Sequence, residues 1–238
     1  MNPSTKGSRL ESTDPGGALK APRAAAVAGI LFSLLLITGL LMLRRAVPAG
    51  PIEAGQWLRE SSGTVTVALN LVPFAGIAFL WFIGVLRDRL GDYEDRFFAT
   101  VFMGSGFLFL AMLFTAAAFL GGIVAAYRVG FERLPGSVTF TVALEFAYEA
   151  MNIYAVRMAA VFTTAISTLA LRTGFISRWI AYIGYATALA MFCAGRNIDW
   201  IVLVFPIWVL VLSLYILIDN FGVLPKVDTS DSDRKGDA

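Results

Sequence analysis

The chain alternates between long apolar runs and short polar segments. Six apolar runs stand out, at approximately residues 24–43, 65–86, 97–127, 150–171, 179–194 and 200–218. A helix needs about 20 consecutive apolar residues to cross a bilayer. None of the runs alternates polar and apolar positions with the two-residue period of a membrane barrel. The pattern therefore predicts an all-α fold, a polytopic membrane helix bundle with about six transmembrane helices.

Polar segments with mixed charges flank these runs at both ends of the chain. Residues 1–23 and 219–238 hold too few apolar side chains to fold by themselves, which predicts two disordered cytosolic tails around one transmembrane domain, 24–218. The first run ends at Arg44-Arg45 and exceeds the 7–15 or so apolar residues of a signal peptide. We interpret it as an uncleaved helix, with cleavage near Ala49 as the alternative.

Composition supports the membrane interpretation and narrows the class of protein. Hydrophobic residues make up 58% of the chain and charged residues 15%, whereas soluble domains carry about a quarter charged residues. The net charge of +2 with no basic patch argues against nucleic acid as a partner. The preference for Arg over Lys, with much Ala, Gly and Val, is typical of a GC-rich bacterial gene. We therefore expect a multi-pass protein of the cell (inner) membrane.

The basic residues predict the orientation, because cytosolic loops carry the excess of Lys and Arg. With both termini inside, the cytosolic segments hold about twice as many basic residues as the outer ones. Those inside are Lys6, Arg9, Lys20, Arg23, Arg87, Arg89, Arg96, Arg172, Arg178, Lys226, Arg234 and Lys235; those outside are Arg44, Arg45, Arg59, Arg128, Arg133 and Arg196. The bias favours an N-in/C-in topology.

Histidine is absent from the chain, and Cys193 is its one cysteine. This excludes His-ligated haem, zinc-protease motifs and His-activated serine or cysteine nucleophiles. A lone cysteine in an apolar run forms no internal disulfide and is typical of a small buried hydrophobe. We expect no cofactor, no bound metal and no enzymatic activity.

A charged turn, residues 87–96, joins the second and third predicted helices. Asp88, Arg89, Gly91 and Asp92 lie in it, and snorkelling arginines paired with acids around a flexible glycine explain it structurally. Residues 84–91 also resemble the G-x-L-a-D-R-x-G-R-R loop motif of the major facilitator superfamily. There the loop joins the same two helices on the cytosolic side, and its Asp and Arg help to lock the inner gate.

The resemblance covers about ten residues. The residues that match are Gly84, Leu86, Asp88, Arg89 and Gly91, whereas Asp92 and Tyr93 stand where the superfamily has basic residues. Six helices are also half the usual number. The turn is therefore a candidate cytosolic gate or docking site.

A second set of polar residues is expected near the outer ends of the even-numbered helices. It comprises Asn70, Glu145, Glu149, Asn152, Arg157 and Asp199. Regular helical geometry turns Arg157 about 80° from Glu149, and the guanidinium either snorkels to the interface or faces Asp199 or Glu149 across a polar cavity. Charges inside a membrane span frequently mark functional sites.

These residues support two functional hypotheses. The first is a small permease-like or ligand-binding membrane protein that uses the outward-facing polar cluster, as a homo-oligomer because six short helices enclose little space. The alternative is a non-enzymatic accessory or scaffold subunit that docks a membrane partner through the 87–96 turn. In either case the lipid bilayer surrounds the protein.

Overall fold

The computed structural model describes residues 20–47, 56–90, 96–130, 134–174, 177–194 and 198–222. Within these ranges all regular structure is helical, which confirms the all-α prediction there. In chain order the helices are α2 (Lys20–Ala46), α3 (Gln56–Glu60), α4 (Ser62–Leu90), α5 (Arg96–Arg128), α6 (Val138–Glu149), the π-helical turn η2 (Ala150–Ala155), α7 (Val156–Thr173), α8 (Arg178–Cys193), the 3₁₀ turn η3 (Asp199–Leu203) and α9 (Val204–Gly222).

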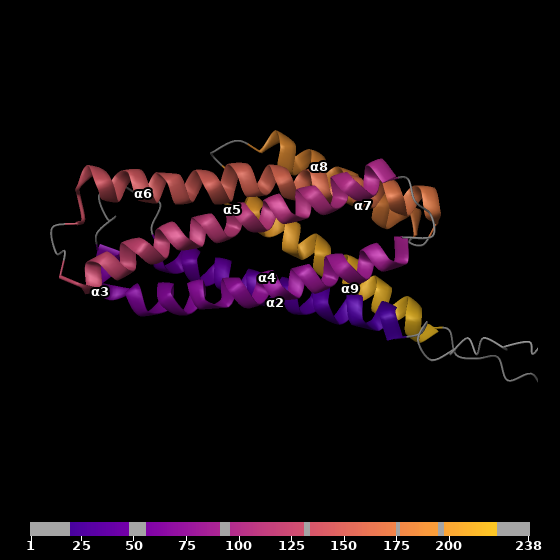
Figure 1. The fold of residues 1–238 in the computed structure, drawn as a ribbon, viewed down its shortest axis with the longest axis horizontal. Coiled ribbons are helices and arrows are strands. Elements are labelled where there is room, and N and C mark those ends of the chain that lie inside the picture. The colour runs from indigo at the N-terminus through magenta and orange to yellow at the C-terminus, as the bar shows by residue number, and fades with distance from the viewer. Residues whose placement is uncertain are drawn as a thin grey trace, which may run out of the picture.

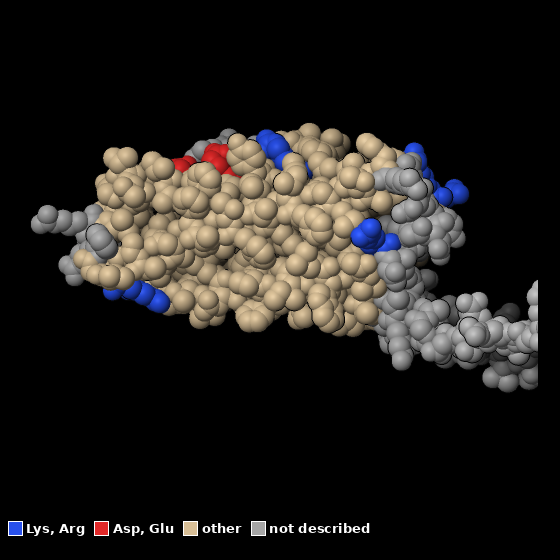
Figure 2. Space-filling model, in the orientation of Figure 1, with Lys and Arg blue, Asp and Glu red and all other residues tan. Residues whose placement is uncertain are grey.

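Five helical segments of the described chain are long and apolar enough to cross a membrane. They are Ala24–Ala46, Ser62–Arg87, Phe97–Arg128, Val138–Thr173 and Trp200–Ile218. With 16 residues, α8 is shorter and reaches about 24 Å. In Figure 2 the broad visible face is almost free of charge, and charged atoms lie at its ends and along its upper edge. The protein is a multi-pass membrane protein.

The helices form an elongated bundle (Figure 1). α2 packs against α4 and α9, and α5 packs against α7. The beginning of α2 and the end of α9 lie at one end of the bundle, and α3 lies at the other, which we call the α3 end. α8 runs back along α7 only to the middle of the bundle, where α9 begins. The half near the α3 end therefore has fewer helices around it.

The fourth predicted helix is longer than its apolar run. The apolar pattern places its start near Ala150, but the 12-residue α6 precedes η2 and α7 without a break, giving one helix, Val138–Thr173. Ser137 caps its start, with Oγ accepting a hydrogen bond from the Phe140 amide at 3.1 Å. Because Glu145 and Glu149 interrupt the apolar pattern without breaking the helix, hydropathy alone places the start too late.

The main core is built around phenylalanine rings contributed by every long helix except α8. Phe32 of α2 and Phe79 of α4 have ring centroids 4.5 Å apart, and Phe79 lies 5.2 Å from Phe162 of α7. Phe109 of α5 and Phe205 of α9 lie 4.8 Å apart. Offset and edge-to-face ring pairs of this kind stabilise packing beyond the area that they bury. These contacts join α2, α4, α5, α7 and α9 in one core.

A second, separate core cluster lies toward the α3 end. It contains Leu43, Ala46, Trp57, Leu58, Val65, Ala68, Leu120, Ile123, Val124, Phe140 and Ala147. On the Val138–Thr173 helix, Ala147 belongs to this cluster and Ala155 to the main core. The boundary between the two apolar clusters therefore falls at the π-helical turn.

Candidate functional site

A hydrogen bond between distant segments marks this boundary. Arg44, near the end of α2, donates from Nη2 to Oδ1 of Asn152 in η2 at 3.0 Å. Asn152 is 6% exposed, and its Nδ2 donates to the Tyr148 carbonyl at 3.1 Å. Both ends of this buried amide are thus satisfied, as buried polar groups require. The bond joins the end of α2 to the middle of the Val138–Thr173 helix.

The π-helical turn also changes which residues share a face of the Val138–Thr173 helix. A π turn closes i→i+5 hydrogen bonds and so holds about one residue more than an α turn. In a continuous α-helix, Glu149 and Arg157 would be about 80° apart. When the extra residue is left out of the count, the angle between Glu149 and Arg157 falls to about 20°. The angle between Glu145 and Arg157 likewise falls from about 120° to about 20°. The π turn therefore corrects the expected separation of Glu149 and Arg157.

Five side chains consequently form one line along the helix, which we call the polar strip: Glu145, Glu149, Arg157, Thr164 and Thr168. Glu145 is exposed and the other four are half-buried. Thr164 and Thr168 donate to the carbonyls of Ala160 and Thr164 at 2.9 and 2.8 Å. Tyr185 of α8 extends the strip, because its hydroxyl lies 2.7 Å from Thr168 Oγ1. The strip is distinct from the buried Asn152, which faces α2.

Arg157 lies near the middle of the Val138–Thr173 helix. Its Nη1 donates to the Ile153 carbonyl, one turn earlier, at 3.3 Å. The guanidinium is therefore drawn toward the beginning of the helix and toward Glu149. A guanidinium has five N–H donors, so this contact leaves capacity for further acceptors.

Of the other predicted residues of the outer cluster, Asn70 does not join this arrangement, and the side chain of Asp199 lies outside the described structure. Asn70 is exposed on α4, and no hydrogen bond joins it to Asn152 or Arg157. Asp199 begins η3, which contacts η2, and only its backbone is described. The expectation that Arg157 faces Asp199 or Glu149 therefore stays a prediction.

The cytosolic turn is mostly outside the described structure. Asp88 and Arg89 lie in the last turn of α4, where only their backbone is described. Gly91 and Asp92 lie outside the described residues. The gate or docking role of this turn stays a prediction.

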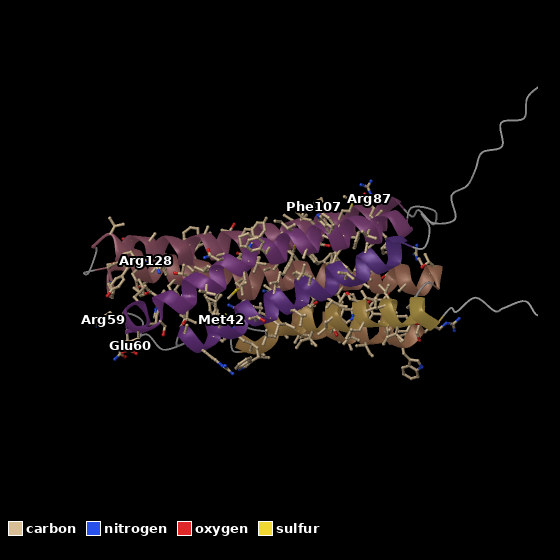
Figure 3. All side chains as sticks on the ribbon, turned by 90° about the horizontal axis from the view of Figure 1, so that it is seen from below. Met42, Arg59, Glu60, Arg87, Phe107 and Arg128 are labelled. Carbon is tan, nitrogen blue, oxygen red and sulfur yellow. The ribbon has the colours of Figure 1, made fainter. Side chains whose placement is uncertain are left out.

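The α3 end carries its own polar group. Figure 3 shows Arg59, Glu60 and Arg128 at this end and Arg87 at the opposite one. Arg128 Nη2 donates to Thr66 Oγ1 at 2.9 Å, which joins α5 to α4. This second long-range arginine bond provides a comparison for the Arg44–Asn152 bond.

Sequence reasoning alone misses the role of Arg44. The apolar pattern assigns it to an outer loop because it directly follows the first apolar run, whereas α2 continues to Ala46 and carries it into the bundle. The sequence signal that could have identified Arg44 is its position directly after an apolar run, where the helix can continue for another turn. Among the described residues, no group of three or more Cys, Asp or Glu residues is placed to hold a metal ion.

Comparison with known proteins identifies no relative. No family model matches the chain, and no significant match exists among curated proteins or solved structures.

Proposed function

We propose that this chain is a small permease-like or ligand-binding membrane protein that recognises a small polar ligand at an outward-facing cluster. Glu149 and Arg157 on the polar strip form the ligand-facing part of the cluster, and the buried Arg44–Asn152 pair supports the same π-helical turn from the α2 side. The observation that carries the proposal is the Arg44–Asn152 hydrogen bond within a π-helical turn. π turns inside α-helices occur frequently at functional sites.

The ligand class follows from the donors present. Arg157 offers N–H groups beyond the one that the Ile153 carbonyl accepts, and it lies inside a membrane span. Arginine forks suit carboxylate and phosphate oxygens in particular. A small ligand with anionic or acceptor-rich groups fits this chemistry best.

We further propose that six helices pass through the inner membrane of a bacterium, with both termini in the cytosol. Because α2 begins and α9 ends at the same bundle end, the chain makes an even number of passes between them (Figure 1). In this topology α8 is the fifth and shortest of the six helices, and the excess of Lys and Arg lies inside. The Arg44–Asn152 cluster then faces the outer half of the membrane.

Ligand-induced thermal shifts test this function. The purified protein in detergent is screened against small carboxylates, phosphate and phosphate esters. We expect at least one compound to raise the melting temperature of the wild type, and Asn152→Leu and Arg157→Ala to abolish that rise. Thr66→Val is the matched control, because it removes the other long-range arginine bond at the α3 end and should leave the shift intact.

Two results would contradict the proposed function. One is a folded wild-type protein that none of these compounds stabilises. The other is a thermal shift that survives in both Asn152→Leu and Arg157→Ala, which would place the ligand elsewhere.

A further inference from the structure

The bundle is longer than a lipid bilayer is thick. The Val138–Thr173 segment has 36 residues and α5 has 33, which correspond to about 54 and 50 Å of helix. The hydrocarbon core of a bilayer is about 30 Å thick, and membrane helices tilt by up to about 40°. Even at that tilt, both helices rise through about 38 Å or more. Part of each helix therefore lies beyond the hydrocarbon.

Polar residues mark one level of the bundle, about 30 Å from the end where α2 begins and both α7 and α9 end, which we call the terminal end (Figure 1). In α2, about 20 residues or 30 Å of helix lead from the start of the apolar span to Arg44. The same length leads from Arg172, near the end of α7, back to Asn152. The apolar span Trp200–Ile218 begins directly after Asp199.

Contacts between the helices place these residues at the same level. Arg44 Nη2 donates to Asn152 Oδ1 at 3.0 Å, and η3, which begins at Asp199, contacts η2. α8 also ends near this level, and α9 runs back from it toward the terminal end (Figure 1). Hydrocarbon cannot satisfy the backbone groups of a chain that leaves one helix and enters the next. We propose that the hydrocarbon core ends at the Arg44–Asn152 level and that the α3 end is a head that stands in water.

The head comprises residues 56–66, 118–130 and 134–151 of the described chain. In α5 and in the Val138–Thr173 helix it rises about 16–20 Å beyond the hydrocarbon, the length of about 11 to 14 helical residues. Lipid headgroups extend the bilayer by only about 5–8 Å on each side. The upper part of the head is therefore in the aqueous phase.

This position of the bilayer accounts for the described charged side chains. Arg87, Arg172 and Arg178 lie toward the terminal end. The head and its boundary carry Arg44, Arg45, Arg59, Glu60, Arg128, Glu145 and Glu149. Among the charged side chains that the structure describes, Arg157 alone then lies within the hydrocarbon, about 7 Å below Asn152. Its Nη1 donates to the Ile153 carbonyl, so the guanidinium extends toward the boundary, as that of a snorkelling arginine does.

The end of the head is arranged as a surface in water requires. α3 buries Trp57 and Leu58, which are 2% and 0% exposed, and leaves Arg59 and Glu60 exposed. In the hydrocarbon part the arrangement differs, since Trp81 of α4 is 69% exposed. Water drives apolar side chains of a helix inward, whereas lipid tails do not. The apolar cluster that contains Leu58 is separate from the main core and gives the head a core of its own.

The depth of the candidate ligand site follows from this boundary. Glu149 then lies in the headgroup region and Arg157 just beneath it, so a ligand from the aqueous phase reaches both without crossing the hydrocarbon. This deepens the proposed function, and the statement that the head is on the outer side of the membrane rests on the proposed topology. The position of the boundary along the bundle depends on neither.

Cysteine labelling in native membranes tests the boundary. In a Cys193→Ala background, single cysteines replace Val142 in the head and Leu108 in the hydrocarbon part, and each protein is treated with N-ethylmaleimide. The two native side chains are 61% and 52% exposed, so packing shields them to a similar extent. Ala125→Cys, at an exposed position in the head, provides a second head variant on the same helix as Leu108.

We expect both head cysteines to be labelled at least about tenfold faster than Leu108→Cys, because the reactive thiolate forms in water and not in hydrocarbon. Labelling after denaturation in dodecyl sulfate should be equal for all three. N-ethylmaleimide crosses membranes, so the result does not depend on which side the head faces. Head cysteines labelled as slowly as Leu108→Cys, or a Leu108→Cys protein labelled as fast as they are, would overturn the proposal. The assay uses no ligand, so its outcome is separate from that of the thermal-shift screen.

Discussion

Gly184 lies where α8 meets α7 and α9, and a single added methyl group should disturb that junction. A Cβ there would overlap Ser167 Oγ and come within 3.2 Å of Trp208 Nε1. Ser167 is 1% exposed and Trp208 is 3% exposed, so neither side chain has room to move outward. Gly184→Ala therefore forces these helices apart.

The size of the effect follows from two opposing contributions. Overpacking a well-filled interior costs about 1–3 kcal/mol. Replacing a helical glycine by alanine recovers about 0.5–1 kcal/mol of backbone entropy. We expect Gly184→Ala to lower the free energy of unfolding by about 1 kcal/mol, within a range of about 0–2.5 kcal/mol. Each kcal/mol corresponds to about 2–4 °C in melting temperature.

The obstructing hydroxyl supplies a rescue. Ser167 Oγ has no hydrogen-bond partner among the described residues, so Ser167→Ala removes a buried polar atom without breaking a bond. The double-mutant cycle compares melting temperatures in one detergent for four proteins: the wild type, each single variant and the double variant. The double variant should be close to Ser167→Ala.

The control is Gly104→Ala, because no neighbouring side chain or helix of the described chain lies within 4 Å of the position that the added methyl group would take. It should be neutral or slightly stabilising. A Gly184→Ala protein as stable as the wild type would refute the packing argument. So would an equal loss of stability with and without the Ser167 hydroxyl.

Three further predictions address the backbone and the topology. Gly174 ends α7 at φ +69°, so Gly174→Val should cost about 1–2 kcal/mol of unfolding free energy, measured by thermal unfolding. Cysteines at Ser62 and Gly91, in a Cys193→Ala background, should be labelled from opposite sides of the membrane; labelling from one side would exclude the six-helix N-in topology. Deleting Met151 should convert the π turn to a regular α turn that keeps Glu149 and Arg157 about 20° apart, so helicity by circular dichroism and the ligand-induced thermal shift should both be preserved.

The helices can be recognised from sequence because a membrane span is a local property. An apolar run long enough to cross the bilayer must satisfy its backbone internally, and a helix does so without reference to other segments. Five of the six predicted runs overlap segments of the described structure that are long and apolar enough to cross a membrane. α8 occupies the remaining run as a shorter helix.

The candidate site can be predicted only in part. Asn152 and Arg157 stand out because polar and charged residues are rare within apolar runs. Arg44 does not, since its importance depends on Asn152, which is 108 positions away. Asn70 is grouped with Asn152 and Arg157 only because all three are expected at a similar depth in the membrane. In the structure Asn70 is exposed on α4.

That this is a helical membrane protein follows from the length and hydropathy of each apolar run, because neither depends on long-range contacts. Which polar residues meet depends instead on how the helices pack. The six-residue π turn is invisible to hydropathy, yet it changes the helix phase by about one residue and so aligns Glu149 with Arg157. The extra residue lets the helix present one set of side chains to the core before the turn and a differently phased set after it. The turn lies where the two apolar clusters meet and Arg44 contacts Asn152.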